Sequence, residues 1–199
     1  MAIGIFGGTF DPPHIGHLIL ADEALTQLGL DRVLWVLTAD PPHKQSRSLT
    51  DLDDRLDMLT AAIASNPCFE ISRVDIDRPP PHYAVDTVRL LSQIYLRDTL
   101  VYLMGGDSLH DLPSWHTPVQ FVEACSRIGV LRRPRDRIDM RRLERLIPGV
   151  TGKIQFIDAP RLDISSTEIR HKISEGHPYQ YYLPPAVYLI IQAKNIYSR

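Results

Sequence analysis

The chain has 199 residues, of which 44% are hydrophobic and 23% charged, so its composition is that of a globular protein and excludes a disordered chain. This length fits one domain with a hydrophobic core large enough to fold without disulfides. The chain has 22 Lys and Arg residues and 24 Asp and Glu residues, so its net charge is −2, which excludes a generally polycationic nucleic-acid binder.

Short apolar runs alternate along the chain with segments of helical periodicity. In chain order, they predict a strand at 2–6, a helix at 15–28, a strand at 32–37, a helix at 52–63, a strand at 69–74, a helix at 85–94, strands at 99–104 and 126–131, a helix at 140–146, a strand at 153–157, and helices at 166–174 and 185–193. Gly29 is a plausible stop for the first helix, and Thr50 or Asp51 can cap the second.

Strands separated by helices of this length indicate βαβ units and a parallel sheet. We expect loops at residues 38–49, at the proline-rich 78–82 and at the arginine-rich 132–137. No internal repeat and no clear linker divide the chain. In a sheet of this kind, ligands bind at the carboxyl ends of the strands, near the point where the strand order reverses.

The stretch from Gly7 to His17, G-G-T-F-D-P-P-H-I-G-H, lies between the first strand and the first helix. Glycines let backbone N–H groups approach a ligand, and a helix N-terminus favours an anion. His14 and His17 are three residues apart and share a face of the opening helical turn. This pattern favours a phosphate site, because no third residue at a recognisable spacing supports a zinc site. It is neither a Walker A loop nor G-x-G-x-x-G.

A second polar stretch, I-S-S-T-E-I-R, ends at Arg170. Ser165 with Glu168 has the spacing of a capping box, and Ile169 with Ile173 predicts the buried face of a helix. Capping does not account for Arg170, which would lie close to the helix N-terminus and is suited to bidentate phosphate contacts. The stretch therefore predicts a helix start with a second group of phosphate ligands.

The H-I-G-H stretch resembles the signature of the nucleotidyltransferase superfamily. Four further stretches join H-I-G-H: I-S-S-T-E-I-R, the P-P-H-K at 41–44, the G-D-S-L at 106–109 followed by Trp115 and His116, and the R-R-P at 132–134. Together they resemble the motifs of the bacterial nicotinate mononucleotide adenylyltransferase family, from residue 3 to about 185. The resemblance implies an α/β, Rossmann-like nucleotidyltransferase fold, with helices on both faces of a parallel sheet. It implies a single domain over 1–199, in which the part from about 160 to 199 carries the second helix start and a closing helix.

The family joins ATP and nicotinate mononucleotide into nicotinate adenine dinucleotide and pyrophosphate, by direct in-line attack of the mononucleotide phosphate. The resemblance implies a Mg²⁺ ion that arrives with ATP, with no metal site of the protein's own. It implies that the catalytic residues are His17, His14, Lys44 and Arg170. It implies that ATP is bound by Gly8, Thr9, Phe10, His14, His17, Gly105, Asp107, Ser165, Ser166 and Arg170.

For the mononucleotide, the resemblance implies contacts with Thr9, Tyr83, Ala84, Thr87, Trp115 and Arg133. His82 and Ala84 depart from the commoner P-S-Y-T pattern. If backbone N–H groups recognise the nicotinate carboxylate, Ala84 is tolerated; if a hydroxyl does, the preference for the acid over the amide stays open. Trp115 is either a stacking or a core residue. Lys44 and Arg133 can also be interpreted as solvated surface charges without a ligand, and Asp107 as a helix N-cap. His43, His82 and His116 have no assigned role.

Three alternatives remain open. The acceptor could be nicotinamide mononucleotide or phosphopantetheine, or the chain could be a nucleotide-binding sensor without catalysis. The sequence leaves homo-oligomerisation open and offers no nucleic-acid recognition motif. Two cysteines, Cys68 and Cys125, favour a reducing compartment, and no signal-peptide pattern or apolar run near the ~20 residues of a membrane span is present. We therefore expect a cytoplasmic protein with no membrane partner.

Overall fold

In the computed structural model, which describes residues 1–40, 49–131, 138–160 and 162–198, six strands form one parallel sheet. They are β1 (Ala2–Gly8), β2 (Arg32–Leu37), β3 (Phe69–Ser72), β4 (Thr99–Gly105), β5 (Arg127–Leu131) and β6 (Ile154–Ile157). The strand order is β3-β2-β1-β4-β5-β6, and every neighbouring pair is parallel. The order reverses between β1 and β4, and the predicted α/β fold is confirmed.

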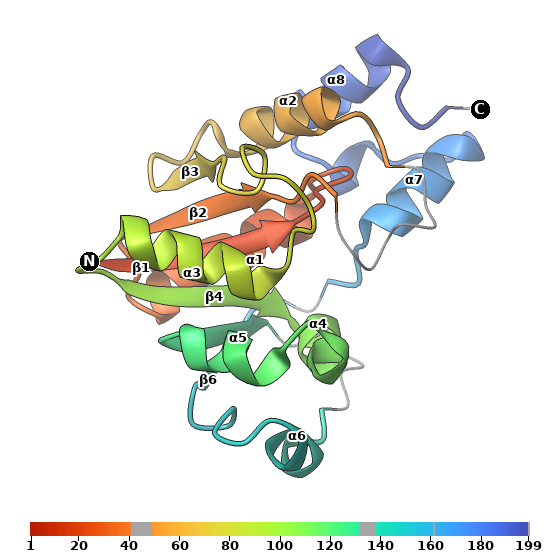
Figure 1. Cartoon of the computed structure of the whole chain (residues 1–199). Helices are drawn as coiled ribbons and strands as arrows, with labels where there is room; N and C mark the ends of the chain where they lie inside the picture. Colours follow the sequence, from red (N-terminus) through yellow and green to blue (C-terminus); the bar gives the residue numbers. More distant parts are fainter. Residues whose placement is uncertain (41–48, 132–137, 161, 199) are drawn as a thin grey trace.

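Helices cover both faces of the sheet (Figure 1). One hydrophobic cluster holds the apolar sides of α1 (Ile15–Gln27), α2 (Leu52–Ile63), α7 (Ser166–Ser174) and α8 (Pro185–Lys194). The other holds those of α3 (Ala84–Ile94), α4 (Gly106–Asp111), α5 (Pro118–Ala124) and α6 (Met140–Leu146). Each central strand contributes side chains to both clusters. In β4, for example, Val101 and Leu103 belong to the first cluster, and Tyr102 and Met104 to the second. Burial on both faces explains why these strands read as continuous apolar runs.

The first predicted helix ends as its sequence indicates. Gly29 has a φ of 61°, and the Leu30 N–H donates to the Leu25 carbonyl at 2.9 Å, which is the Schellman pattern. Asp51 occupies the N-cap of α2, but its side chain forms no capping hydrogen bond.

Four elements were missed by the sequence analysis. They are α4, α5 and two short 3₁₀ turns at Leu112–Ser114 and Gln180–Tyr182. β1 also extends two residues further than predicted, through Gly7 and Gly8, whereas β3 ends at Ser72 instead of residue 74. The glycines and prolines in these segments read as turns, yet Pro118 stands in the first turn of α5, where its missing N–H costs nothing.

The helices near the two edges of the sheet differ in their partners. α8 lies beside α2 near the β3 edge, and Lys194 joins them through ion pairs with Asp54 (2.6 Å) and Asp57 (2.8 Å). α6 lies toward the opposite, β6 edge (Figure 1).

In the part of the chain that the structure describes, no helix has the length and apolar character needed to span a bilayer.

Candidate active site

A cavity of about 500 Å³ lies at the carboxyl ends of β1 and β4, where the strand order reverses. The loop between β1 and α1, the start of α4 and the start of α7 meet around it. Its lining includes eleven of the residues singled out in the sequence: Gly8, Thr9, Phe10, His14, His17, Gly105, Asp107, Trp115, Ser165, Ser166 and Arg170. The two polar stretches, some 150 residues apart in the chain, are thus brought together.

The β1–α1 loop is fixed by close packing beneath it. A Cβ atom on Gly7 would lie 2.8 Å from the Tyr102 hydroxyl, so a larger residue there would require the buried Tyr102 ring to shift. Phe10 has a φ of 45°, a conformation that a bulky residue adopts only when its surroundings impose it. Its ring is 2% exposed and packs against Phe6 and Trp35. Burial of this ring therefore sets the backbone path that lines the cavity.

His14 and His17 stack on each other, with ring centroids 3.6 Å apart. The Nδ1 atom of His17 accepts a 3.1 Å hydrogen bond from the His14 N–H. This bond assigns the proton of a neutral His17 ring to Nε2, which is then a donor. A Cβ on Gly16 would lie 3.1 Å from Nδ1 of His14, so glycine leaves room for that ring. The spacing H-I-G-H thus places both imidazoles in the first turn of α1, as predicted.

The start of α7 faces the same cavity. The Ser165 hydroxyl accepts a 3.2 Å hydrogen bond from the Glu168 N–H, which confirms the predicted cap, and Ile169 and Ile173 are buried. The Ser166 hydroxyl donates to the Pro12 carbonyl at 2.9 Å and so ties α7 to the β1–α1 loop. With α1, a second helix therefore directs its N-terminus at the cavity, which favours an anionic ligand.

Arg170 is held next to this helix start. Its Nη1 donates to the Asp11 carbonyl, and Nη2 donates to the Thr167 hydroxyl at 3.0 Å. Its Nε is buried and has no hydrogen-bond partner among the described residues. An unpaired buried donor is costly. Arg170 also lines the cavity, so its guanidinium is available to an anionic ligand there.

Arg55 of α2, which the sequence analysis did not single out, is 2% exposed and bonds four backbone carbonyls. Those carbonyls belong to Thr9 (3.3 Å), Thr38 (2.9 Å), Ala39 (2.9 Å) and Thr50 (2.9 Å). Burial lowers the pKa of its guanidinium, and the nearby Asp11 carboxylate opposes that shift. Arg55 therefore joins the loops after β1 and β2 to the start of α2.

On the far side of the cavity lie the start of α4 and the residues after it. Gly105 is the N-cap of α4 and Asp107 stands in its first turn, so Asp107 is not the helix cap that one interpretation made it. Trp115 packs against Tyr102 and Phe121 while it also lines the cavity. It therefore combines the core and ligand-facing positions that the sequence left as alternatives.

Comparison with known proteins gives relatives that match nearly the whole chain. The family model described as cytidylyltransferase-like matches residues 5–172. A protein of Thermomicrobium roseum named as a probable nicotinate-nucleotide adenylyltransferase is 41% identical over 98% of this chain and 91% of its own length. The nicotinate-nucleotide adenylyltransferase of Bacillus subtilis is 38% identical over 98% of each chain.

This chain belongs to the cytidylyltransferase-like family and, within it, to the nicotinate-nucleotide adenylyltransferases. The fold agrees. The structure of Plasmodium falciparum nicotinic acid mononucleotide adenylyltransferase complexed with NaAD matches with a TM-score of 0.81 and 22% identity, over 98% of this chain and 97% of that one. Membership confirms the resemblance drawn from the motifs. It favours a nicotinate acceptor over the alternatives of another acceptor or a sensor.

The segment from Tyr83 to Thr87, which the motif resemblance implies for mononucleotide binding, meets the cavity wall through one ring stack. Tyr83, Ala84 and Thr87 are not among the lining residues. The Thr87 hydroxyl is buried and donates to Asp75 at 2.8 Å, and Arg78 bonds both of these side chains. The Tyr83 ring stacks on His116 with centroids 3.9 Å apart. Because His116 follows Trp115, this stack connects the segment to the cavity wall.

Two of the histidines without a predicted role thus have structural partners. His116 has its stack on Tyr83. His82 is 5% exposed, with Nδ1 next to the backbone N and O of Asp40 (3.2 and 3.1 Å) and Nε2 next to the Arg78 carbonyl (3.2 Å). His82 therefore joins the acceptor segment to the loop after β2.

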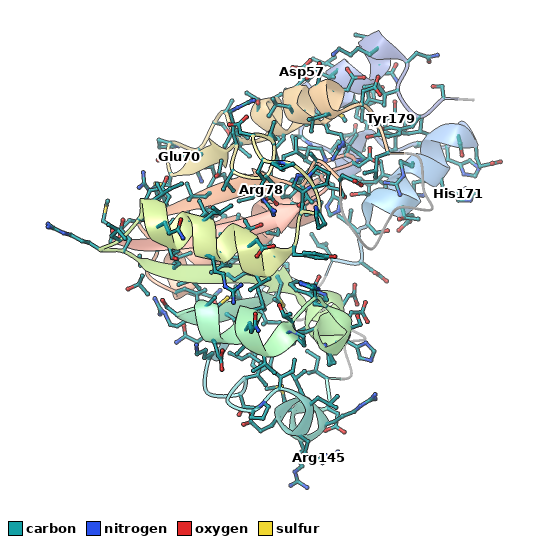
Figure 2. The ribbon with its side chains drawn as sticks, viewed as in Figure 1. Asp57, Glu70, Arg78, Arg145, His171 and Tyr179 are labelled. Atoms are coloured by element: carbon teal, nitrogen blue, oxygen red, sulfur yellow. The ribbon has the colours of Figure 1, made fainter. Side chains whose placement is uncertain are left out.

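Lys44, His43 and Arg133 lie outside the described residues, so their predicted roles stay predictions. The arginines between 127 and 145 can be interpreted as a solvated face of the protein. Arg145 fits that interpretation, because it is exposed and points away from the sheet (Figure 2). Within the described ranges, no group of three or more His, Cys, Asp or Glu side chains is arranged to hold a metal ion.

Three residues that hold the β1–α1 loop escaped the sequence analysis as site residues: Asp11, Arg55 and Tyr197. Asp11 stood inside the quoted glycine-rich stretch, and the structure shows it 2% exposed and hydrogen-bonded to Tyr197. No local pattern marks the other two. Their importance comes from contacts between segments far apart in the chain.

Proposed function

We propose that this chain transfers the adenylyl group of ATP to nicotinate mononucleotide, giving nicotinate adenine dinucleotide and pyrophosphate. The observation that carries the proposal is the meeting of two helix N-termini, two stacked histidines and Arg170 around one cavity, in a chain of this family. Such a cavity offers hydrogen-bond donors and positive charge to a polyphosphate. The two free cysteines agree with a reaction in the reducing cytoplasm.

The reaction needs no covalent enzyme intermediate. An oxygen of the mononucleotide phosphate forms a bond to the α-phosphorus of ATP, and the bond from that phosphorus to the oxygen bridging to the β-phosphate breaks. Pyrophosphate leaves with the electron pair of the broken bond. Because the attacking phosphate is already ionised at neutral pH, the protein's contribution is mainly positioning and charge stabilisation.

On the phosphate side, we assign the largest catalytic role to His17, whose Nε2–H can donate to an oxygen on which negative charge builds. His14, stacked on it, contacts the ATP phosphates together with the backbone of Gly8, Thr9 and Phe10. We assign the Arg170 guanidinium, which lines the cavity, to the triphosphate, and we assign a phosphate contact to Lys44 as well.

The two serines of α7 differ in what they can give the triphosphate. The Ser166 hydroxyl already donates to Pro12, whereas the Ser165 hydroxyl accepts a bond and keeps its hydrogen for a ligand. We assign a side-chain contact to Ser165 and a backbone contact to Ser166. Gly105 and Asp107, across the cavity, are assigned to adenosine and its ribose hydroxyls.

The mononucleotide is assigned to the side of Trp115, whose ring faces the cavity and can stack on the pyridine. Tyr83, Ala84 and Thr87 approach this side through the stack on His116, and the first turn of α3 supplies N–H groups for the nicotinate carboxylate. Thr9 and Arg133 complete the assigned set.

The cavity offers imidazoles, a guanidinium and backbone N–H groups, which suit phosphate oxygens, whereas Mg²⁺ takes oxygen ligands. We propose that Mg²⁺ arrives bound to ATP. When bound, it supplies neutralisation of charge on the triphosphate. The protein's own residues then orient that triphosphate.

The test is incubation of the purified protein with ATP and Mg²⁺ and with either nicotinate or nicotinamide mononucleotide. Pyrophosphate and the dinucleotide are measured together. We expect a higher kcat/KM for the nicotinate compound. Equal use of both would change the assigned specificity, and ATP binding without product from either would support a sensor.

A further inference from the structure

The segment that follows α8 returns to the phosphate side of the cavity. Asn195 and Tyr197 have φ angles of 52° and 69°, so the chain turns sharply as it leaves the helix. Between them, Ile196 is 8% exposed and packs into the first hydrophobic cluster, which fixes the turn. The Tyr197 ring is thereby placed against a loop that lies 186 residues earlier in the sequence.

The Tyr197 hydroxyl donates a 2.7 Å hydrogen bond to Oδ1 of Asp11. Asp11 is 2% exposed, and a buried carboxylate needs donors inside the protein. Burial, reinforced by the charge of Asp11, raises the pKa of the Tyr197 phenol, which therefore stays protonated at neutral pH. A hydrogen bond to a charged acceptor is stronger than one between neutral groups.

Asp11 in turn holds Arg170. The Nη1 atom of Arg170 donates to the Asp11 carbonyl and lies 3.8 Å from Oδ2 of its carboxylate. The opposite edge of the guanidinium is held by Thr167, and Arg170 lines the cavity. A phenol, a carboxylate and a guanidinium thus form a continuous chain of contacts that ends at the phosphate cavity.

We propose that Tyr197 is a positioning residue for ATP, which holds the Asp11 carboxylate and thereby fixes the Arg170 guanidinium against the triphosphate. The proposal rests on the proposed function for the identity of its ligand. Tyr197 does not itself touch the substrate. Its action passes through Asp11, and Arg55 meanwhile holds the carbonyls of the same loop.

The decisive variant is Tyr197→Phe, which keeps the ring and removes only the hydroxyl. We expect it to weaken binding of ATP with Mg²⁺, measured by calorimetry, about 10-fold, the effect of losing one hydrogen bond to a charged group. The KM for ATP should rise by the same factor, while the KM for nicotinate mononucleotide stays within about 2-fold of wild type. A merely structural hydroxyl would lower the melting temperature without this selective change.

The matched control is Tyr179→Phe. The Tyr179 hydroxyl accepts a 2.5 Å hydrogen bond from Gln192 of α8, on the same face of the molecule as α7 and α8 (Figure 2). This variant loses a phenol bonded to a neutral partner and should leave both KM values unchanged. An equal loss of ATP affinity in both variants would overturn the proposal.

A double-mutant cycle with Arg170→Lys tests whether Tyr197 acts through Arg170. Coupled residues give non-additive changes in ATP affinity, so the double variant should bind ATP about as weakly as Arg170→Lys alone. Additive effects, or unchanged ATP affinity in Tyr197→Phe, would overturn the proposal. Because binding is read directly, a wild type that binds ATP but makes no dinucleotide counts against the proposed function and leaves this test valid. A wild type that binds no ATP would overturn both.

Discussion

The phosphate side and the acceptor side of the cavity are held together by different kinds of contact. On the side assigned to phosphate, buried and half-buried polar side chains bond backbone carbonyls of other segments of the chain. Arg55 holds four of them, and Ser166 bonds Pro12 across 154 residues. On the acceptor side, residues 75–87 bond mainly to one another, through Asp75, Arg78 and Thr87. Rings then connect this segment to the cavity.

This difference separates the two functions of the site. A cross-linked phosphate side fixes the geometry of adenylyl transfer, because donors must match the charge that builds in the transition state. The acceptor side is built mainly from local contacts, in which Asp75 bonds both Arg78 and Thr87. We therefore expect variants on the phosphate side to change turnover or ATP binding, and variants on the acceptor side to change the KM for the mononucleotide.

The largest effect is expected for His17→Ala. Loss of a fixed hydrogen-bond donor to the developing charge should lower kcat by at least ~10²-fold. The fold should survive, because the helix keeps its backbone and Ala is a good helix former. Steady-state kinetics with saturating ATP and nicotinate mononucleotide measure this change. The control is His171→Ala, an exposed histidine on α7 (Figure 2), for which kcat should stay at the wild-type value. Near-normal turnover of His17→Ala would remove His17 from its assigned role.

The next effect, on the acceptor side, is expected for Trp115→Ala. Loss of a stacking ring should raise the KM for nicotinate mononucleotide about 10-fold, since an aromatic pair contributes ~1 kcal/mol or more. The KM for ATP should change by less than about 2-fold. Trp115 also packs on Tyr102 and Phe121, so Trp115→Phe, which keeps a ring, serves as the control and should recover most of the loss. Equal rises in both KM values would make Trp115 a structural residue.

A smaller effect is expected for His82→Ser. The change removes a ring that contacts Asp40 and Arg78 and leaves the fixed internal contacts of Asp75, Arg78 and Thr87 intact. Loss of hydrogen bonds worth ~1 kcal/mol should raise the KM for the mononucleotide about 5-fold and leave the KM for ATP unaltered. His177→Ser, an exposed histidine after α7, is the control. If His82→Ser raised the KM for ATP instead, the two sides would not be independent.

The strands and the two polar stretches that meet at the cavity were predictable because their signals are local. Parallel strands buried on both faces leave continuous apolar runs, and the loop before α1 and the cap of α7 each fall within about ten consecutive residues. α4 and α5 were missed because Gly106 and Pro118 read as turn residues when no packing partner is known. Tertiary packing, which no short window contains, decides such segments.

Arg55 and Tyr197 illustrate the same limit within the site. In the sequence, Arg55 is one more charged residue on an amphipathic helix, and only the fold shows that it is buried among carbonyls. Tyr197 reads as a residue beyond the closing helix, and its importance depends on a contact with Asp11 across 186 residues. Roles that consist of joining distant segments leave no local pattern.

The smallest effect is expected for Ala84→Thr, which restores the hydroxyl found in the commoner pattern. Ala84 is the first residue of α3, where the opening N–H groups of a helix have no partner within the helix. If these groups recognise the nicotinate carboxylate, a hydroxyl adds little. The ratio of kcat/KM for nicotinate mononucleotide to that for nicotinamide mononucleotide should then change by less than about 2-fold. Recognition by a hydroxyl would instead raise this ratio about 5-fold or more, the value of one hydrogen bond. Ala84→Ser, which adds the hydroxyl without the methyl group, controls for crowding, and a rise in both variants would assign recognition of the carboxylate to a hydroxyl.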